Sequence, residues 1–258
     1  DIYLHIDKKS SIDLDKIYRP TISNFYLLSN RINVKWGDFS QIRVEISLLK
    51  EAIGNSHYSY YHLLSGVDLP IKSQNYIHDF FDKNQGLEFI DYSQEPSENY
   101  IKRVSKYWLF TYWWKSRNPI IFLLKCLIQP LVMLVNRNLD VEFKKGANWF
   151  SITDECARYI ISNEEYINKR FKYTMCCDEI FLQTLVWNNK ELRNKIYKSN
   201  NEFVGCMREI DWTRGTPYIW QDKDFDELMC AKGLFARKFS FKHMGIVFKI
   251  SNAVCSKK

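Results

Sequence analysis

Short runs of β-forming residues alternate with segments of helical periodicity over the first third of the chain, and this alternation restricts the folds available to it. Strands are predicted at Ile2–Ile6, Asn33–Trp36, Tyr60–Leu64 and Leu87–Asp91, and helices at Ser40–Ile53 and Asn75–Asn84. Crossover helices that connect successive strands favour an α/β fold with a mostly parallel sheet.

The same alternation returns in the second half of the chain. Predicted here are a strand at Trp149–Thr153, helices at Asp154–Asn163 and Asp178–Asn188, a strand at Phe203–Ile210, a helix at Asp224–Met229 and a basic-aromatic turn at Leu234–Phe239. Ser40 and Asp178 are the expected N-caps of their helices. The 258 residues suit one domain, 1–258, and we expect a βα unit to precede the strand that opens the sequence.

An aromatic-basic segment at about 99–145 interrupts this pattern. Seven Lys and Arg residues and no Asp or Glu lie between Asn99 and Leu139, which accounts for the whole net charge of +7. Its apolar part is broken by Lys125 and Pro130, and is shorter than the about 20 residues that a spanning helix needs. Two interpretations stay open, a buried helical hairpin and a peripheral membrane element with Trp, Lys and Arg at the headgroups.

Cysteine usage and charge narrow the class of protein. The seven cysteines are odd in number and lack CxxC spacing, which is typical of a reduced, intracellular chain without structural zinc. The charge is concentrated beside an apolar run instead of forming a continuous basic stripe, so a nucleic-acid-binding protein is the weaker interpretation. A carbohydrate- or nucleotide-binding module without activity is another alternative.

Two short motifs carry residue types suited to catalysis. Asp178 and Glu179 open a predicted helix, where acidic residues are common caps, but a carboxylate there also suits a general base. Arg237 and Lys238 are adjacent cations, which are either a solvated pair or a clamp on a departing diphosphate. The acidic triplets Asp13–Asp15 and Asp224–Asp226 do not follow buried strands, so neither is expected to hold a metal ion.

Seven segments in order along the chain resemble the family of branching β-1,6-N-acetylglucosaminyltransferases and peptide O-xylosyltransferases, in its short bacterial form. They are YLHIDKKS (3–10), VKWGDFSQIRVEISLLKEA (34–52), YYHLLSGVDLPIKS (60–73), KGANWFSIT (145–153), CCDEIFLQTLVWN (176–188), REIDW (208–212) and LFARKF (234–239). Together they cover nearly the whole chain.

The resemblance implies a GT-A fold and an inverting glycosyltransferase that needs no metal or other cofactor. It implies that Glu179 is the catalytic base. It places the donor at Asp7, Asp68, Arg237 and Lys238, and the acceptor at Trp212.

Two positions depart from the family pattern. The Asp that is the base in the xylosyl branch falls at Asn148, an amide that cannot take a proton, which favours Glu179 as sole base. An Arg that supports the diphosphate has no clear counterpart, although Arg208, Arg214 or Arg237 could replace it.

The resulting hypothesis is that an acceptor hydroxyl displaces UDP from a UDP-sugar, most simply UDP-N-acetylglucosamine. The acceptor would be a glycan or a lipid-linked oligosaccharide in bacterial surface polysaccharide synthesis. Segment 99–145 would then contact the membrane, and the protein would be cytoplasmic, at the inner face of the cell membrane. No nucleic acid partner is expected.

Overall fold

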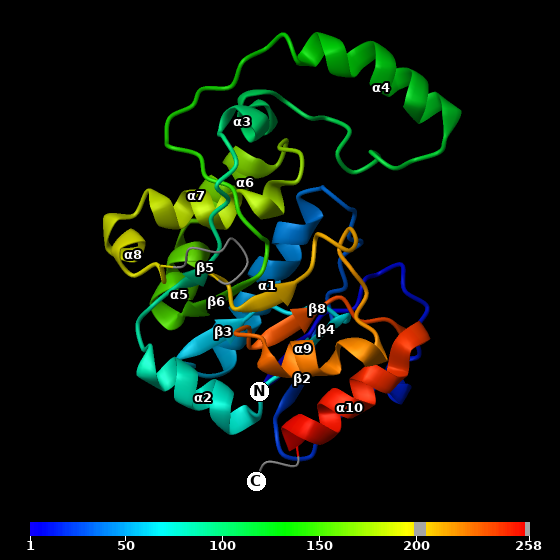
Figure 1. Cartoon of the computed structure of the whole chain (residues 1–258). Helices are drawn as coiled ribbons and strands as arrows, with labels where there is room; N and C mark the ends of the chain where they lie inside the picture. Colours follow the sequence, from blue (N-terminus) through cyan, green and yellow to red (C-terminus); the bar gives the residue numbers. More distant parts are fainter. Residues whose placement is uncertain (199–204, 256–258) are drawn as a thin grey trace. The chain divides into compact units, whose positions relative to one another are not determined.

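A computed structural model describes residues 1–198 and 205–255 (Figure 1). Its residues group into two compact units. Unit 1 comprises residues 1–58, 95–145 and 154–189, and unit 2 comprises residues 59–94, 146–153 and 190–258. The chain therefore passes from one unit to the other several times, and each unit is assembled from three separate segments. The prediction of one catalytic domain over 1–258 stays a prediction.

Unit 1 is mainly helical, with one pair of strands. Its elements are β1 (Ile2–Leu4), η1 (Leu14–Lys16), β2 (Phe25–Leu27), α1 (Ser40–Asn55), α3 (Glu98–Ser105), α4 (Pro119–Val132), α5 (Asp154–Ser162), α6 (Glu164–Phe171), η2 (Cys177–Glu179) and α7 (Phe181–Trp187). β1 and β2 pair in parallel, with Ile2 opposite Phe25. The predicted apolar face of α1 is buried through Ile42, Ile46 and Leu49.

Unit 2 contains the remaining strands and a C-terminal pair of helices. Its elements are β3 (Tyr60–His62), β4 (Asp68–Pro70), α2 (Gln74–Lys83), β5 (Phe89–Ile90), β6 (Phe150–Thr153), α8 (Lys190–Asn194), β7 (Arg208–Ile210), η3 (Asp222–Asp224), α9 (Phe225–Cys230), β8 (Phe235–Arg237), η4 (Phe241–His243) and α10 (Met244–Cys255). They form two sheets, with strand orders β3-β6-β5 and β4-β8-β7.

The strand pairings confirm a mixed α/β protein but not a mostly parallel sheet. β6 is antiparallel to both of its neighbours, and β8 is antiparallel to β4 and parallel to β7. Within the described residues, two pairings are thus parallel and three are antiparallel. The expectation of parallel strands came from the predicted crossovers, but β5 and β6 are brought together across a long connection that reverses the direction of the chain.

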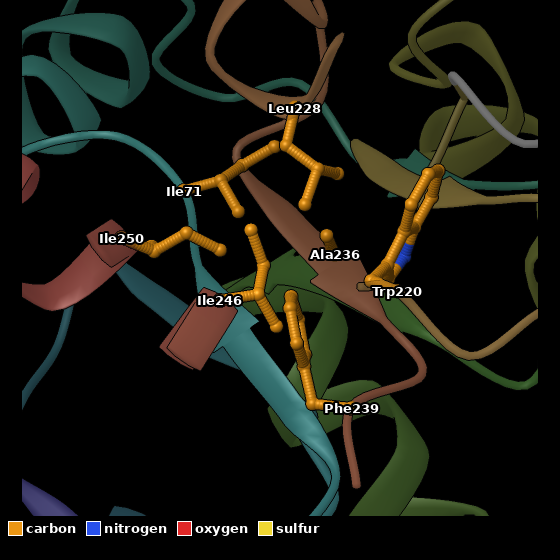
Figure 2. Close-up of a cluster of buried hydrophobic side chains, with 7 residues drawn as sticks. All are labelled: Ile71, Trp220, Leu228, Ala236, Phe239, Ile246 and Ile250. Atoms are coloured by element: carbon orange, nitrogen blue, oxygen red, sulfur yellow. The ribbon is translucent and has the colours of Figure 1, made fainter. Parts of the chain in front are cut away.

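One apolar cluster of unit 2 packs α9 and α10 against β8 (Figure 2). Its buried members are Ile71, Trp220, Leu228, Ala236, Phe239, Ile246 and Ile250. Ile246 and Ile250 are one helical turn apart on α10, so they enter the cluster from the same face. The cluster fixes β8, which carries Arg237 and leads directly into Lys238.

The predicted strand at Asn33–Trp36 is not formed, and β2 pairs with β1 in its place. Side chains take the backbone donors that a strand would use. Val34 N–H donates to Asp7 Oδ1 and Lys35 N–H donates to Ser40 Oγ. Ser40 is accordingly the first residue of α1, not its N-cap, which is Phe39.

Three other predicted elements differ in extent or type. The strand placed at Phe203–Ile210 begins at Arg208, and residues 199–204 lie outside the described part of the chain. The predicted turn at Leu234–Phe239 contains β8, because its backbone pairs with β4 and β7. Segment 99–145 is not a buried hairpin, since α4 leaves most of its apolar side chains exposed.

Candidate active site

Glu179 is the last residue of the 3₁₀ turn η2 and lies two residues before the start of α7 at Phe181. Its side chain is 37% exposed. Its Oε2 accepts a hydrogen bond from Arg103 Nη1 on α3 at 2.7 Å. Across the described residues, no donor lies within hydrogen-bond distance of its other oxygen, Oε1. A half-exposed carboxylate held through one oxygen keeps the second one available to accept a proton.

Asp178 is buried, and it is not the predicted N-cap. α7 begins at Phe181 and has no side-chain cap, while Asp178 Oδ2 accepts from Gln41 Nε2 on α1 at 2.8 Å. Burial, reinforced by the charge of neighbouring Glu179, raises the pKa of Asp178 to about 7. The two adjacent carboxylates therefore have different environments, and only Glu179 is open to solvent.

The turn that carries these carboxylates is packed on the loop that precedes α1. Cys176 N–H donates to the Gly37 carbonyl at 2.9 Å, and Gly37 N–H donates to Gln41 Oε1 at 2.7 Å. Gly37 has a φ of +71°, and a methyl group on its Cα would lie 3.2 Å from Cys176 Sγ. The close approach and the backbone angle both favour glycine at this position. Two motifs far apart in the sequence, around residues 37 and 178, thus meet inside unit 1.

Asp7 lies three residues after the end of β1, and its carboxylate binds groups of two other segments of the backbone, at Lys9 and Val34. Its carboxylate accepts from Lys9 N–H at 3.1 Å and forms an ion pair with Lys9 Nζ at 3.0 Å. Burial alone would raise the pKa of Asp7, but the hydrogen bonds from Lys9 and Val34 outweigh it, and the pKa is lowered. Asp7 is therefore ionised at neutral pH.

In unit 2, Asp68 and Arg237 are opposite each other on β4 and β8. Arg237 Nη1 lies 3.5 Å from Asp68 Oδ1, and the guanidinium stacks over the Trp149 ring with 4.2 Å to its centroid. The Asp68 side chain is almost completely buried, and its Oδ2 accepts from Ser65 N–H at 2.7 Å. Asp68 and Trp149 together fix the orientation of Arg237 from two sides.

Lys238 follows Arg237 at the end of β8. Its backbone is held in place by the Tyr218 carbonyl, which accepts from Lys238 N–H, and by Trp220 N–H, which donates to the Lys238 carbonyl. Considering the described residues alone, the Lys238 ammonium has no ion pair or hydrogen bond. A positioned backbone with an uncommitted ammonium group is what an anion-binding lysine requires.

The two other arginines that could bind the diphosphate, Arg208 and Arg214, already have partners within unit 2. Arg208 is buried, and it donates to the carbonyls of Leu63, Phe150 and Cys206 and to Ser151 Oγ. Burial lowers the pKa of Arg208 to about 10. Arg214 pairs with Asp211, Asp224 and Glu227. Of the three candidates, Arg237 has the fewest competing partners.

The acidic triplets and Trp212 lie on loops and helix starts. Asp13 Oδ1 accepts from Asp15 N–H at the start of η1, and Asp224 Oδ2 accepts from Gln221 N–H at the start of η3. Both triplets thus have capping roles in the structure. Trp212 lies just after β7 with 48% of its surface exposed, as a stacking platform for a sugar requires.

The structure groups the predicted residues within each unit. Asp68, Arg237 and Lys238 are brought together in unit 2, which also contains Trp212, while Asp7 and Glu179 belong to unit 1. That all six serve one site stays a prediction. Sequence reasoning missed Arg103 as the partner of Glu179, because the only signal was its place in a basic segment 76 residues away. It also missed Trp149 beneath Arg237.

A cavity of about 890 Å³ lies in unit 1. Five cationic residues contribute to its lining, Lys8, Arg31, Arg43, Lys169 and Lys172. Neither Asp7 nor Glu179 is among its lining residues, although Lys8 neighbours Asp7 in the chain. Asp38 and Glu165 also line the cavity, so its cationic residues outnumber its acidic ones, which suits an anionic ligand.

The fold and these side chains define a mixed α/β protein with a partly exposed carboxylate in one unit, and an oriented arginine followed by an uncommitted lysine in the other. A family model described as Core-2/I-Branching enzyme matches residues 2–230. The chain belongs to the Core-2/I-Branching enzyme family, a family of glycosyltransferases.

Curated relatives agree with this assignment. The chain is 22% identical to Xylosyltransferase oxt of Drosophila melanogaster and to Xylosyltransferase 2 of Rattus norvegicus, and 21% identical to Xylosyltransferase 2 of Homo sapiens. Each match covers 92% of this chain but only 28% of the relative. The chain thus corresponds to less than a third of the length of these proteins.

Proposed function

We propose that this chain transfers a sugar from a UDP-sugar to a hydroxyl group of a glycan acceptor, with inversion at the anomeric carbon and without a metal ion. Membership of the Core-2/I-Branching enzyme family supports the reaction class. The donor sugar we propose is N-acetylglucosamine. Xylose is the second candidate, because the relatives described above are named xylosyltransferases.

The observation that carries this proposal is the contrast between two neighbouring carboxylates. Asp178 is buried and has a raised pKa, whereas Glu179 is partly exposed and is held through one oxygen by Arg103. A general base must be both ionised and within reach of the acceptor hydroxyl, and Glu179 alone of the pair is exposed to an incoming acceptor. Arg103 then orients the carboxylate so that Oε1 receives the proton.

Arg237 and Lys238 are proposed to bind the diphosphate. In the displacement, the acceptor oxygen forms a bond to the anomeric carbon while the bond to the UDP oxygen breaks. Negative charge grows on the departing diphosphate, where the oriented Arg237 guanidinium and the uncommitted Lys238 ammonium stabilise it. Asp68 acts through Arg237, whose guanidinium it orients. Trp212 is proposed to stack on the acceptor, and Asp7 to contact the nucleoside.

The test is a UDP-release assay across UDP-sugars with wild-type protein and Glu179→Gln. A positioned base contributes roughly 10²–10⁴-fold, so Glu179→Gln is expected to lose turnover by that factor while UDP affinity, measured by calorimetry, stays the same. Glu191→Gln is the control, since Glu191 is an exposed acid on α8. Wild-type turnover by Glu179→Gln would refute the assignment of the base.

The same assay tests the absence of a metal. Wild-type turnover is expected to continue in EDTA at an unchanged rate. Strong inhibition by EDTA that manganese reverses would overturn the proposal that the reaction needs no metal ion. The assignment of Glu179 as the base would still be tested separately by Glu179→Gln.

A further inference from the structure

α4 and the residues after it expose an apolar surface in unit 1. The large apolar side chains that are more than one third exposed are Ile120, Phe122, Leu123, Leu124, Leu127, Ile128, Leu131, Leu134 and Val135, which we call the α4 face. Leu127 and Leu131, one turn apart, are 59% and 65% exposed. Soluble proteins rarely leave so many neighbouring large apolar side chains in contact with water, so such a surface indicates a partner.

The α4 face belongs to a well-formed helix and not to an unfolded loop. Asn118 Oδ1 accepts from Ile120 N–H at the start of the helix, and Pro119 is its first residue. On its inner side, Gln129 donates to the Tyr107 carbonyl at 2.7 Å and accepts from Leu109 N–H at 3.1 Å. Gln129 is the buried residue of α4, which lies apart from the other helices of unit 1 (Figure 1).

Positive charge and tryptophan are concentrated in the segment of the chain that leads into this apolar helix. The flanking cations are Lys102, Lys106, Lys115 and Arg117, and α4 itself contributes Lys125. Lys125 Nζ lies 4.8 Å from the Trp114 ring centroid, and the neighbouring Trp113 is 47% exposed. No Asp or Glu occurs between Asn99 and Leu139, so no acidic side chain of this segment offsets these cations.

We propose that the α4 face inserts into the headgroup region of an anionic lipid membrane. Apolar side chains would leave water for the acyl boundary, tryptophan would lie at the interface, and lysine and arginine would contact the lipid phosphates. α4 has 14 residues and is therefore about 21 Å long, less than the about 30 Å of a hydrocarbon core. None of the helices in the described residues has the length and apolar content of a membrane span.

A second copy of the chain is a poorer partner for the α4 face. A symmetric pair would place two sets of Lys115, Arg117 and Lys125 close together, and this segment has no acidic residue to compensate. Like charges that face each other across an interface cost binding energy. An anionic lipid surface meets both requirements at once, since it offers apolar depth beneath negative charge.

Membrane binding is independent of the proposed sugar transfer, although it would bring the enzyme to a lipid-linked acceptor. The test is flotation of the full chain with vesicles of phosphatidylcholine alone and of phosphatidylcholine mixed with phosphatidylglycerol. We expect binding to the anionic vesicles that weakens as salt is added. Leu127→Asp with Leu131→Asp should weaken it about tenfold or more, because two leucines no longer leave water.

The matched control is Ile22→Asp with Phe241→Asp. These side chains are 99% and 91% exposed outside α4, so the control adds the same charge and removes similar apolar surface. A second pair, Lys102→Gln with Arg117→Gln, should weaken binding to anionic vesicles, and Lys223→Gln with Lys232→Gln should not.

Three outcomes would overturn the proposal. They are no binding of the wild type to either vesicle, equal loss in the α4 variant and its control, and a dimer in light scattering that the α4 variant dissociates without any vesicle binding. Because no sugar transfer is measured in the flotation assay, none of these outcomes bears on Glu179.

Discussion

At the scale of single residues, the contrast between Asp178 and Glu179 shows how position decides the chemistry of a side chain. The two carboxylates are adjacent in the sequence, yet one is bonded to Gln41 in the interior of unit 1 and the other to Arg103 near its surface. The DE pair alone is compatible with a helix cap, and only the environment of each oxygen separates a structural role from a catalytic one.

The raised pKa of Asp178 predicts a dependence of stability on pH. Its pKa is about 7 in the folded protein and 3.8 when unperturbed. Between these values the folded chain holds a proton that the unfolded chain releases, so the free energy of unfolding falls as the pH rises from about 4 to about 7. Asp178→Asn has no carboxylate to ionise. Its free energy of unfolding should therefore exceed that of the wild type by up to about 4 kcal/mol at about pH 7.

Urea unfolding followed by tryptophan fluorescence across this pH range measures the effect. Asp13→Asn is the control, because Asp13 is an exposed carboxylate in the same unit. If Asp178→Asn and the wild type lost stability in parallel as the pH rises, Asp178 would not carry a proton in the folded protein.

At the scale of elements, the sequence predicts a helix or strand correctly where the spacing of the segment's own apolar residues matches the face that it buries. The one-sided spacing of Ile42, Ile46 and Leu49 predicts α1, and the structure buries all three. The structure also forms helices close to Asn75–Asn84 and Asp154–Asn163, and a strand within Trp149–Thr153. In each of these segments, local propensity and tertiary packing favour the same state.

Sequence-based prediction fails where contacts between residues far apart in the sequence determine the local structure. Asn33–Trp36 has the composition of a strand, but Asp7 and Ser40 take its backbone donors. No element is predicted over α10, which contains several β-branched residues; its helical state is supported by the packing of Ile246 and Ile250 in the cluster of Figure 2. In the same way, family motifs identify Glu179 and Lys238 as candidates, but no spacing rule connects Arg103 with Glu179 or Trp149 with Arg237.

The contact between the loop before α1 and the turn before α7 predicts a cost for a small substitution. In Gly37→Ala, an alanine must adopt the positive φ of Gly37, which costs about 1–2 kcal/mol for a residue with a Cβ. Its methyl group would also lie only 3.2 Å from Cys176 Sγ. Gly86→Ala has the same backbone problem at a φ of +83°, but no atom lies within 4 Å of the added methyl group. Gly37→Ala should therefore destabilise the protein more.

The midpoint of chemical unfolding compares the two alanine variants directly. Their difference isolates the packing of Gly37 against Cys176 and Met175, since the backbone strain is common to both. Equal midpoints would mean that the turn carrying Glu179 does not depend on close contact with this loop.

At the scale of the whole molecule, the predicted donor residues are divided between units that are themselves interleaved along the chain. Asp7 belongs to unit 1, whereas Asp68, Arg237 and Lys238 belong to unit 2. Neither unit is a continuous stretch of sequence, so a truncation that keeps one unit intact is not available. Ligand binding by the full chain is the appropriate way to learn whether the two sets serve one donor.

UDP should raise the midpoint of thermal unfolding of the wild type, because a ligand that binds only the folded state adds about 2.7 kcal/mol at 100 times its Kd. If Asp7 and Lys238 contact the same nucleotide, Asp7→Asn and Lys238→Ala should each reduce that shift. The double variant should then lose less than the sum of the two, since little binding remains for the second change to remove.

Asp13→Asn and Lys242→Ala, both exposed and outside the predicted site, are the controls. A full UDP shift in Asp7→Asn together with a lost shift in Lys238→Ala would confine the nucleotide to unit 2 and remove Asp7 from the donor site.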